Sequence, residues 1–582
     1  MNVRLAFDPE SEDRRQVAKS LQSDSGRRNR QIDFRARGIT KQGRDEIRQQ
    51  LRDTLVFYEQ LFGPYPLDEL TVVTVPRNFS QGLPGFLSLS TLMMTDPGTE
   101  WRDLFTAEID RRLVVAHEVA HQWWGGLLRT ANRRDRWIDE AMASYAATVY
   151  SRQKLDWRGR FQIGFTTRWP PELLHLEHGT RPVESLGPLV LGERLDSSRA
   201  PYAYAFITYG KGALVIDMLA QTVGEQKFIA ILRDLFAHET FISTESLLGY
   251  VSRGASRDLQ PFSKYFVYGT GVPEIEYQVD VRGGAGKWTI HLTGERVDPW
   301  RYRIRVAKRD DGALDVVRET VPVASAPLPT LLVPMQVALE NRTKTDEGLK
   351  YAKRMIDLSA PKFALDFDIP WEPKDVALDR DREVLALVYT KGRNAKEVLL
   401  KRGVNLAAAG KTSEAEAAFK EALAAKASTE LQSALNHLAP IGLSLPAGVD
   451  IGSSYKSILL DVQNQITNAA LHLSLARLYI DQGKTAPAAD EVKQANRALD
   501  SDYHPWIDDE VALLEARLDM RRGEYKSAFD RLSKSMKENG GDSAEAYALL
   551  AIAAKQSGQT AELQRAIDGA RELGVDVTAI GN

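Results

Sequence analysis

The sequence of 582 residues predicts a multidomain α+β protein: a mainly helical domain with a small sheet, then a small β-sandwich, then an array of paired helices. Three observations support this prediction. The length favours about four domains. The period of the apolar residues changes along the chain, from mixed helical and strand patterns to a period of two and then to a helical period. In the last third, one spacing of glycine and small residues occurs four times.

Composition restricts the class of protein and of site. Hydrophobic residues make up 43% of the chain, charged residues 27%, and the net charge of −3 gives no bias toward nucleic acid or an anionic membrane. The chain has no cysteine, so disulfides and thiolate ligands are excluded and a metal site must use His, Asp or Glu. No apolar run predicts a transmembrane helix. The first 50 residues lack the apolar region of a signal peptide, and export would require a leader upstream of Met1.

Residues 1–40 are charged and show no steady apolar period. Arginines are frequent at the end of this stretch. We predict a solvated N-terminal arm or the remnant of a missing domain, and a nucleic-acid contact is the weaker alternative.

Residues 41–275 alternate helical and short strand patterns, which predicts a mainly helical domain. An amphipathic helix over 42–62 ends at Gly63-Pro64-Tyr65-Pro66. Strands are predicted where β-branched and apolar residues concentrate, over 70–75 and 86–94. The remaining helices are predicted at about 103–124, 138–154, 204–222, 225–237 and 244–252.

Residues 276–380 change to a period of two. Ile275–Val281, Trp288–Leu292 and Tyr302–Val306 alternate apolar and polar residues, with turns rich in Gly and Asp between them. This pattern predicts a small antiparallel β-sandwich, and edge hairpins on the preceding domain are the alternative.

Residues 381–582 are predicted to be helical and repetitive. The repeated spacing is a small residue, a glycine seven positions on, and three small or apolar residues that follow the glycine. The copies are Gly403, Gly410, Ala415, Phe419, Ala422; Ala476, Gly483, Ala488, Val492, Ala495; Ala516, Gly523, Ala528, Leu532, Ser535; and Ala551, Gly558, Leu563, Ile567, Ala570. The pattern resembles tetratricopeptide repeats, in which the glycine ends one helix and small residues let the next approach closely. Such arrays usually bind peptides or partner proteins, so a protein partner is predicted here, although packing alone would also account for the pattern.

A candidate metal site lies in the first domain, where His117-Glu118-x-x-His121 falls on a predicted helix. Side chains four residues apart share one helix face, so both imidazoles can reach one ion. Glu118 points beside that ion, where it suits a base acting on water. Two core histidines and a surface glutamate are the alternative. The apolar helix around the motif argues against it, because uncompensated polar groups are costly there.

A third ligand is available eighteen residues after His121, where Glu140 opens the next predicted helix. Together these positions resemble the M1 family of zinc metallopeptidases, which includes the aminopeptidase N and leukotriene A4 hydrolase groups. Ala116–Gly125 and Trp137–Tyr145 match its zinc-binding stretches, and Phe62–Pro66, Tyr209–Leu214 and Phe262–Pro273 match further motifs.

The resemblance covers about 41–375 and implies a thermolysin-like catalytic domain that hydrolyses peptide bonds in a peptide or protein substrate. It implies one Zn²⁺ per chain with His117, His121 and Glu140 as ligands, Glu118 as general base and Tyr209 as transition-state donor. Three protein ligands leave one zinc position open for water, whose pKa falls to about 7. Without the resemblance, Tyr209 is better explained as a core tyrosine.

The chain departs from the M1 pattern in two places. Family aminopeptidases carry a Gly-x-Met-Glu-Asn strand whose Glu binds the substrate's α-ammonium group. Here the stretch Ser80–Ser90 has no carboxylate, and a buried amine needs a counter-charge, so strict aminopeptidase specificity is not expected. The strand predicted at 86–94 is expected to be an edge strand that pairs with a substrate backbone. The family's N-terminal β-domain is also missing, which indicates a fragment, a more open site, or a partner that fills the gap.

Three functions follow from these observations. The first is an active zinc peptidase whose repeats recruit a substrate or partner. The second is a non-catalytic, peptidase-like scaffold that binds proteins through its repeats. The third is a helical-repeat adaptor with a structural zinc, which is less favoured because no fourth protein ligand is evident. The intact ligands, Glu118 and Tyr209 favour the first.

Overall fold

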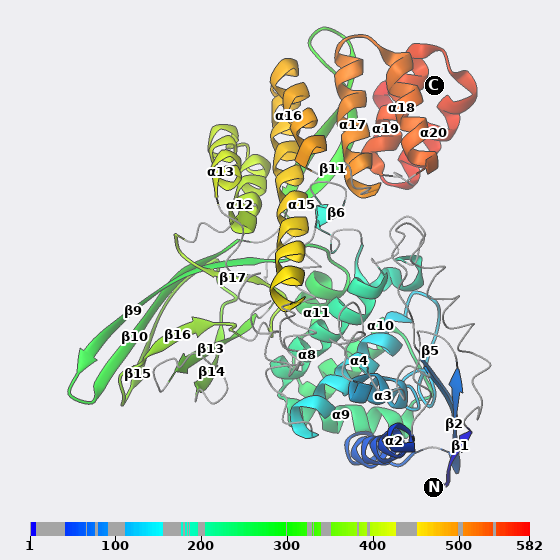
Figure 1. Cartoon of the computed structure of the whole chain (residues 1–582), viewed down its shortest axis with the longest axis vertical. Coiled ribbons are helices and arrows are strands. Elements are labelled where there is room, and N and C mark those ends of the chain that lie inside the picture. Colours follow the sequence, from blue (N-terminus) through cyan, green and yellow to red (C-terminus); the bar gives the residue numbers. More distant parts are fainter. Residues whose placement is uncertain are drawn as a thin grey trace.

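The computed structural model describes residues 2–6, 41–65, 67–75, 80–90, 111–154, 176–177, 181–182, 184, 187–195, 204–297, 300–322, 329, 331–338, 351–380, 383–392, 396–425, 451–498, 505–538 and 543–581. Figure 1 shows three parts: a mainly helical part near the N-terminus, long twisted strands beside it, and packed helices toward the C-terminus. Among the described residues, no helix is both long and apolar enough to cross a bilayer.

The first part is mainly helical, as its sequence pattern predicts. The α-helices are α2 (Lys41–Phe62), α3 (Arg111–Ala120), α4 (Trp137–Lys154), α8 (Gly212–Val223), α9 (Glu225–His238), α10 (Thr244–Ala255) and α11 (Gln260–Phe262). Shorter helical segments are η4 (Leu189–Leu195), η5 (Ala205–Lys211) and η6 (Ser263–Val267), of which η5 and η6 are π-helical. The predicted helix at 103–124 is described only from residue 111 onward, so its first residues lie outside the described chain.

A small sheet lies beside these helices, in the strand order β1-β2-β4-β3. Its strands are β1 (Asn2–Ala6), β2 (Glu69–Val75), β3 (Gln81–Leu83) and β4 (Phe86–Ser90). β1, β2 and β4 are parallel, and β3 pairs antiparallel with β4 at one edge. Short two-stranded pairs join β5 (Arg129–Thr130) to β8 (Phe241–Ile242) and β6 (Leu176–Glu177) to β7 (Arg181–Pro182).

This sheet corrects two sequence-based expectations. Residues 2–6, assigned to a solvated arm, form β1, because their backbone pairs with β2 from Asn2↔Glu69 to Ala6↔Val73. The remainder of the expected arm, 7–40, lies outside the described residues. β4, expected to be the edge strand, is internal, because it pairs with β2 on one side and β3 on the other. The edge beside β4 is therefore the three-residue strand β3.

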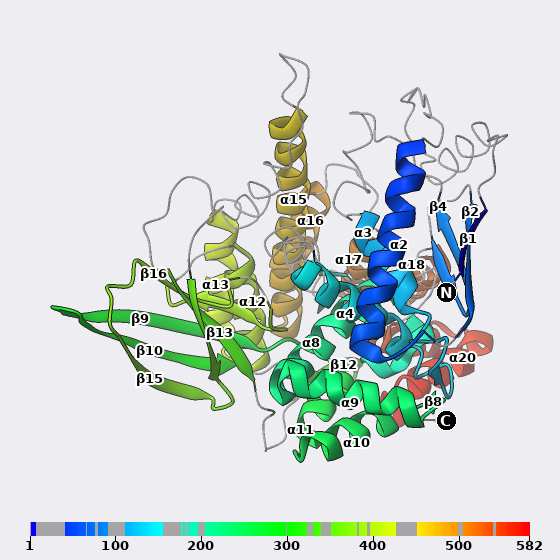
Figure 2. The same ribbon diagram turned by 90° about the horizontal axis from the view of Figure 1, so that it is seen from below.

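The core of the first part lies where α2, α3 and α4 meet. Val115, Ala116, Val119 and Ala120 of α3 are fully buried, and the Tyr58 hydroxyl of α2 donates to the Ala116 carbonyl at 2.9 Å. Figure 2 shows α2 lying across α3 and α4. These contacts fix the axis of α3, the helix that carries the His117 motif.

The second part contains two antiparallel-rich sheets, in agreement with the period of two. One sheet has the order β15-β10-β9-β17 and the other the order β14-β13-β16. The strands are β9 (Glu274–Gly284), β10 (Lys287–Val297), β13 (Leu332–Ala338), β14 (Tyr351–Asp357), β15 (Lys362–Ile369), β16 (Asp375–Leu378) and β17 (Leu387–Thr390). β17 pairs parallel with β9, so this part extends past the expected boundary at residue 380.

One hairpin of the second part stands apart from both sheets. β11 (Trp300–Lys308) and β12 (Leu314–Pro322) pair only with each other among the strands that the structure describes. Their buried residues belong to the core of the C-terminal helices and not to the core of the sheets.

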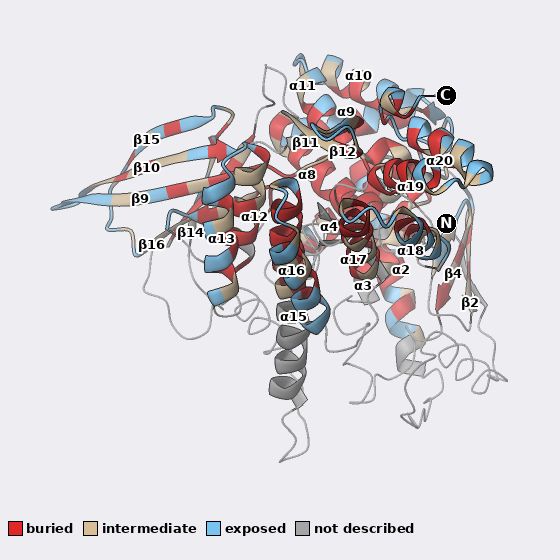
Figure 3. Cartoon of the chain, turned by 90° about the horizontal axis from the view of Figure 1, so that it is seen from above, coloured by how far each residue is buried: buried red, intermediate tan, exposed pale blue. Residues whose placement is uncertain are grey.

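The third part consists of helices that pack in successive pairs. The helices are α12 (Lys396–Ala408), α13 (Thr412–Ala424), α15 (Ile451–Asp481), α16 (Thr485–Ala498), α17 (Pro505–Arg521), α18 (Tyr525–Glu538), α19 (Ala544–Ser557) and α20 (Thr560–Glu572), followed by η7 (Thr578–Ile580). Figure 3 shows their buried faces in red, whereas the far ends of β9, β10 and β15 are exposed. The stretch 426–450 lies outside the described residues.

The repeated glycines lie at the turns between paired helices. Gly410, Gly483, Gly523 and Gly558 have φ between +74° and +80°, a conformation that glycine adopts without strain. Gly403 allows close approach, because a Cβ there would lie 2.4 Å from the Phe419 ring. These positions suit the tetratricopeptide-like array, which stays a prediction.

Candidate metal centre

The two histidines of the candidate site lie at the end of α3. His117 is in the last turn of this helix, and His121 directly follows its last residue, Ala120. Because the two are four residues apart, they share one face of the turn. α3 is held by buried apolar contacts on its other faces, so both imidazoles point toward α4.

Glu140 comes from the first turn of α4. The start of α4 is fixed by polar contacts with α10. Asp135 accepts hydrogen bonds from the Thr244 amide at 2.9 Å and from its hydroxyl at 2.8 Å, and the Trp137 indole donates to the same hydroxyl at 2.9 Å. These contacts set the position at which the Glu140 carboxylate meets the two histidines.

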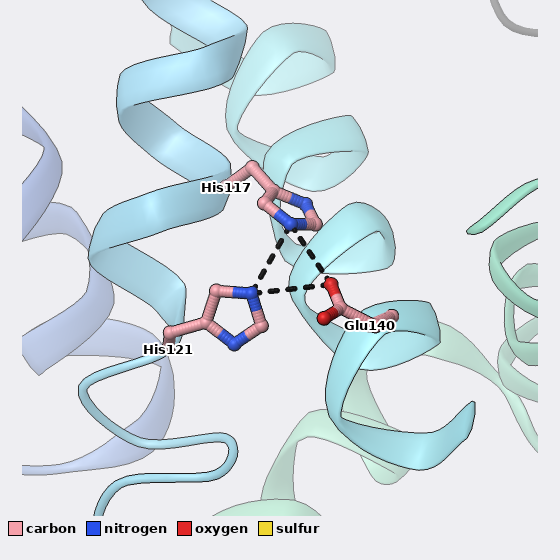
Figure 4. Close-up of side chains that lie close together, drawn as sticks. All are labelled: His117, His121 and Glu140. Carbon is pink, nitrogen blue, oxygen red and sulfur yellow. Dashed lines mark hydrogen bonds and ion pairs between the residues drawn. The ribbon is translucent and has the colours of Figure 1, made fainter. Parts of the chain in front are cut away.

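Figure 4 shows the three side chains converging on one point. The Nε2 atoms of His117 and His121 are 3.1 Å apart, and each lies 3.3 Å from Oε2 of Glu140. Two ligand atoms about 2.0–2.1 Å from a tetrahedral zinc ion would lie roughly 3.3–3.4 Å apart. The separations between the three atoms therefore fit one shared ion.

Hydrogen bonds on the far side of each ring support this fit. Nδ1 of His121 lies 3.1 Å from the Trp124 carbonyl, which can only accept, so Nδ1 carries the proton and Nε2 keeps its lone pair. Nδ1 of His117 lies 3.2 Å from the buried Ser144 hydroxyl, which can accept in the same way. Two Nε2 atoms that face each other at 3.1 Å need a proton or a metal ion between them.

The surroundings of the Glu140 carboxylate favour its ionised form and a positive charge beside it. Its Oε2 atom is buried and lacks a hydrogen-bond partner within the described part of the chain. Burial opposes ionisation, yet the neighbouring His117 and His121 hold the pKa of Glu140 well below its usual range. Burial lowers the pKa of His121, but its contact with Glu140 outweighs this and raises that pKa to about 9. The site thus attracts one positive charge, as a proton or as a metal ion, and its donor set suits zinc.

Glu118 lies beside this group and is 7% exposed. Burial raises the pKa of its carboxyl group, and the two histidines partly oppose that effect. The Gly82 amide of β3 donates a hydrogen bond to it. A Cβ on Gly82 would lie 2.3 Å from the Glu118 carbonyl oxygen and 2.9 Å from Cβ of His121, so only glycine fits at this contact.

Tyr209 reaches the site from the π-helical segment η5. Its ring stacks on the His117 ring with centroids 5.7 Å apart and an angle of 25°, and Tyr204 meets it edge-on at 5.8 Å. Burial, followed by the nearby charge of Glu140, raises the pKa of Tyr209 well above its ordinary value. The hydroxyl therefore stays protonated and can donate.

The structure brings together all five residues that the sequence predicted for the site: His117, Glu118, His121, Glu140 and Tyr209. The positions and roles of Ser144, Trp124 and Gly82 were not predicted. The position of Ser144 could have been predicted from the sequence, because this residue lies one helical turn beyond Glu140. The other two act through backbone groups, whose contacts leave no pattern in the sequence.

Gln122 joins the His117-Glu118-x-x-His121 motif to the edge strand. Its side-chain amide donates to the Leu83 carbonyl at 2.8 Å, and its Oε1 accepts from the Gly85 amide at 2.9 Å. One side chain thus bonds to both ends of the β3–β4 turn, and β3 is held directly over the end of α3.

Comparison with known proteins points to one peptidase family. Residues 48–265 match the domain described as Peptidase family M1 domain. Aminopeptidase N of Streptomyces lividans is 28% identical over 176 residues, which cover 29% of this chain and 20% of that protein. Leucyl aminopeptidase of Saccharolobus solfataricus is 24% identical over 252 residues, which cover 42% of this chain and 30% of that protein. The matched segment therefore spans less than a third of these relatives.

A solved structure, Legionella pneumophila aminopeptidase A in complex with aspartic acid, overlaps 91% of this chain and 58% of that chain, with 13% identity and a TM-score of 0.42. The family match and the aminopeptidase relatives show that residues 48–265 are similar to M1 peptidase domains.

Proposed function

We propose that this chain hydrolyses peptide bonds with one Zn²⁺ held by His117, His121 and Glu140. The observation that carries the proposal is the triangle of ligand atoms, with sides of 3.1, 3.3 and 3.3 Å, in which the Trp124 carbonyl holds His121 in the tautomer that presents Nε2. When bound there, zinc supplies a Lewis acid that polarises the scissile carbonyl and lowers the pKa of water.

Glu118 acts as the general base. It is adjacent in sequence to a ligand, and its burial raises its carboxyl pKa toward neutrality. A base of this kind removes a proton from the attacking water, holds it, and delivers it to the leaving amine. The hydrogen bond from Gly82 orients the carboxylate for both transfers.

Tyr209 donates to the oxyanion that forms during attack. Its raised pKa keeps the hydroxyl proton in place, and the stacking on His117 sets the direction of the ring. Loss of one such donor typically costs ~3–4 kcal/mol of barrier.

The substrate backbone pairs with β3, the edge strand, and not with β4. Residues 81–85 of this hairpin read Gln-Gly-Leu-Pro-Gly, which offers no carboxylate for a substrate ammonium group. A free N-terminus therefore gains no counter-charge from this strand. The enzyme accepts peptides with blocked as well as free N-termini.

Zinc content and hydrolysis, measured side by side on wild type and Glu118→Gln, test this proposal. Internally quenched peptides with free and acetylated N-termini serve as substrates. We expect about one zinc per chain in both proteins, and hydrolysis of both peptides by wild type only. Glu118→Gln keeps the side-chain volume and the ligands, so it removes the base alone.

The outcomes separate the competing functions. Stoichiometric zinc without hydrolysis by wild type would favour the peptidase-like scaffold. Hydrolysis restricted to free N-termini would show that another group binds the amine. Absence of zinc from both proteins would refute the proposal.

A further inference from the structure

Within the described part of the chain, the β11–β12 hairpin pairs with no strand of the two sheets of its own part. A two-stranded hairpin is marginally stable alone in water, so another element must cover it. Ile304, Val306, Leu314 and Val316 are buried, at 3–8% exposure, in the same core as the C-terminal helices. These alternate residues place one face of the hairpin against the helices.

The polar contacts of the hairpin reach the first helix of three different pairs. Asp315 pairs with Arg521 of α17 at 2.5 Å, Arg318 lies 3.5 Å from Glu545 of α19, and the Thr320 hydroxyl donates to Ala408 of α12 at 2.8 Å. Because the first helices of successive pairs lie side by side in such an array, the hairpin lies along one continuous face of them.

The hairpin also completes a buried charge network among these helices. Arg477 of α15 contacts Glu510 and Glu545 at 3.1 and 2.7 Å. The side chains of Arg517 and Glu545 are 3% and 1% exposed, and the hairpin supplies an acid, Asp315, 3.8 Å from Arg517. Buried charges are costly without partners. The Asp315 carboxylate of the hairpin therefore stabilises the buried Arg517 of the helices.

The backbone of β11 is bound as well. The Val306 amide donates to the Asp576 carbonyl at 2.8 Å, and the Asp576 amide donates to Ile304 at 3.3 Å. Arg305 and Asp576 are the paired residues of this parallel bridge. The segment after α20 thus adds to the edge of β11, which removes an exposed strand edge.

We infer that the face formed by α12, α17 and α19 is a strand-binding site whose ligand is the chain's own β11–β12 hairpin, bound in cis. The face on which a peptide partner would be expected is therefore filled by the chain itself. The hairpin ties the helical part to the peptidase part, and a partner of the helices must use another surface. This inference does not depend on peptidase activity.

Cysteine cross-linking tests the bound position, because the natural chain has no cysteine. In Arg305→Cys/Asp576→Cys the new side chains sit on bridged strands about 4.8 Å apart, within disulfide range. We expect an intramolecular disulfide on mild oxidation, seen by intact mass and by migration as a monomer on non-reducing gels. The matched control is Asp311→Cys/Asp576→Cys, whose first cysteine lies at the hairpin turn, more than about 13 Å further along, and should not link.

Hydrogen exchange gives a second readout with single substitutions. Asp315→Asn removes the charge that faces Arg521, and we expect roughly tenfold faster exchange in peptides covering 302–320, since a charged hydrogen bond is lost. Asp311→Asn is the control, because its side chain is 60% exposed and its hydrogen bonds among the described residues are to Arg309 and Ala313 of the hairpin turn, while Arg521 acts on it only as a more distant charge.

Linked dimers instead of monomers would mean that the hairpin binds a second copy, and would overturn binding in cis. Failure to link in a protein with wild-type circular dichroism would overturn the bound position. Equal exchange in Asp315→Asn and Asp311→Asn would show that the helices do not hold the hairpin through this contact.

Discussion

At the scale of single residues, one buried ion pair lies close in the chain to Tyr209, the proposed donor to the oxyanion. Lys211 lies two residues after Tyr209 in η5, and its side chain and that of Glu184 are 1% and 0% exposed. The lysine donates to Glu184 at 2.5 Å and to the Gly269 carbonyl at 3.0 Å, and the Gly271 amide also donates to Glu184. The pair joins the Tyr209 segment to the turn that precedes β9.

We expect Lys211→Met to destabilise the fold by ~3–5 kcal/mol, because it leaves Glu184 buried and unpaired. We also expect kcat to fall with little change in KM, because displacement of Tyr209 removes an interaction that forms only in the transition state. Urea unfolding and steady-state kinetics measure the two effects. In a Tyr209→Phe background, Lys211→Met should lower kcat little further.

The partly buried pair Arg152–Asp217, which links α4 to α8 at 2.6 Å, offers the control. Arg152→Met should destabilise the protein without a selective loss of kcat. If Lys211→Met lowers kcat equally in the wild-type and Tyr209→Phe backgrounds, the pair does not act through Tyr209.

The convergence of His117, His121 and Glu140 could be predicted because metal-binding chemistry fixes the spacing of candidate ligands. Two histidines on one helix face and a glutamate opening the next helix leave a local pattern. The Lys211–Glu184 pair leaves none, since its members are 27 residues apart and meet only through tertiary packing. The contact of the Trp124 carbonyl with His121 also leaves no pattern in the sequence, because every residue type has a backbone carbonyl.

At the scale of elements, the contact between β3 and the end of α3 depends on one glycine. We expect Gly82→Ala to move β3 away from α3, because the added Cβ would lie 2.3 Å from a backbone oxygen that cannot rotate aside. A misplacement of about 1 Å near the chemistry can lower the rate about 10²-fold. Peptide hydrolysis and zinc content measure the effect, and zinc should stay bound.

Gly284→Ala is the matched control, because no atom lies within 4 Å of the position of its Cβ. It should hydrolyse peptides like wild type. Wild-type activity in Gly82→Ala would mean that the close contact of β3 with α3 is not needed for catalysis.

Most helices and strands were predictable because their periods extend over several turns or residues. The edge strand was not, because β3 has three residues and is too short to show a period. β4 has the buried leucines and intervening serine typical of a half-exposed strand, yet two neighbours cover its edges. β1 was missed for a similar reason, since only five residues of a polar stretch pair with β2.

At the scale of the whole molecule, the buried residues form two cores. One joins α2, α3, α4, α8 and α9 to the sheets of the second part, and the other joins the C-terminal helices to the β11–β12 hairpin. The sequence predicted the three parts but not this grouping. β11 alternates apolar and polar residues, as the neighbouring strands do. Such alternation shows which face of a strand is buried, but it does not show which other element covers that face.

The two cores predict two thermal unfolding transitions, since each buries its own apolar surface and multidomain chains depart from two-state behaviour. Leu514 is fully buried in the second core and Leu219 is 1% exposed in the first. Each Leu→Ala substitution should cost about 2–5 kcal/mol and lower the midpoint of its own transition by several degrees. Differential scanning calorimetry measures both midpoints.

Removal of zinc should lower only the transition of the first core, because an ion held by α3 and α4 stabilises the state that binds it and no other. Chelation of the wild type, followed by addition of zinc, should shift that midpoint reversibly and leave the other in place. A single transition that moves as a whole in Leu219→Ala, in Leu514→Ala and on chelation would mean that the two cores unfold as one cooperative unit, joined by the hairpin and by contacts of α12 with β9 such as that of Arg402 with Glu276 at 3.2 Å.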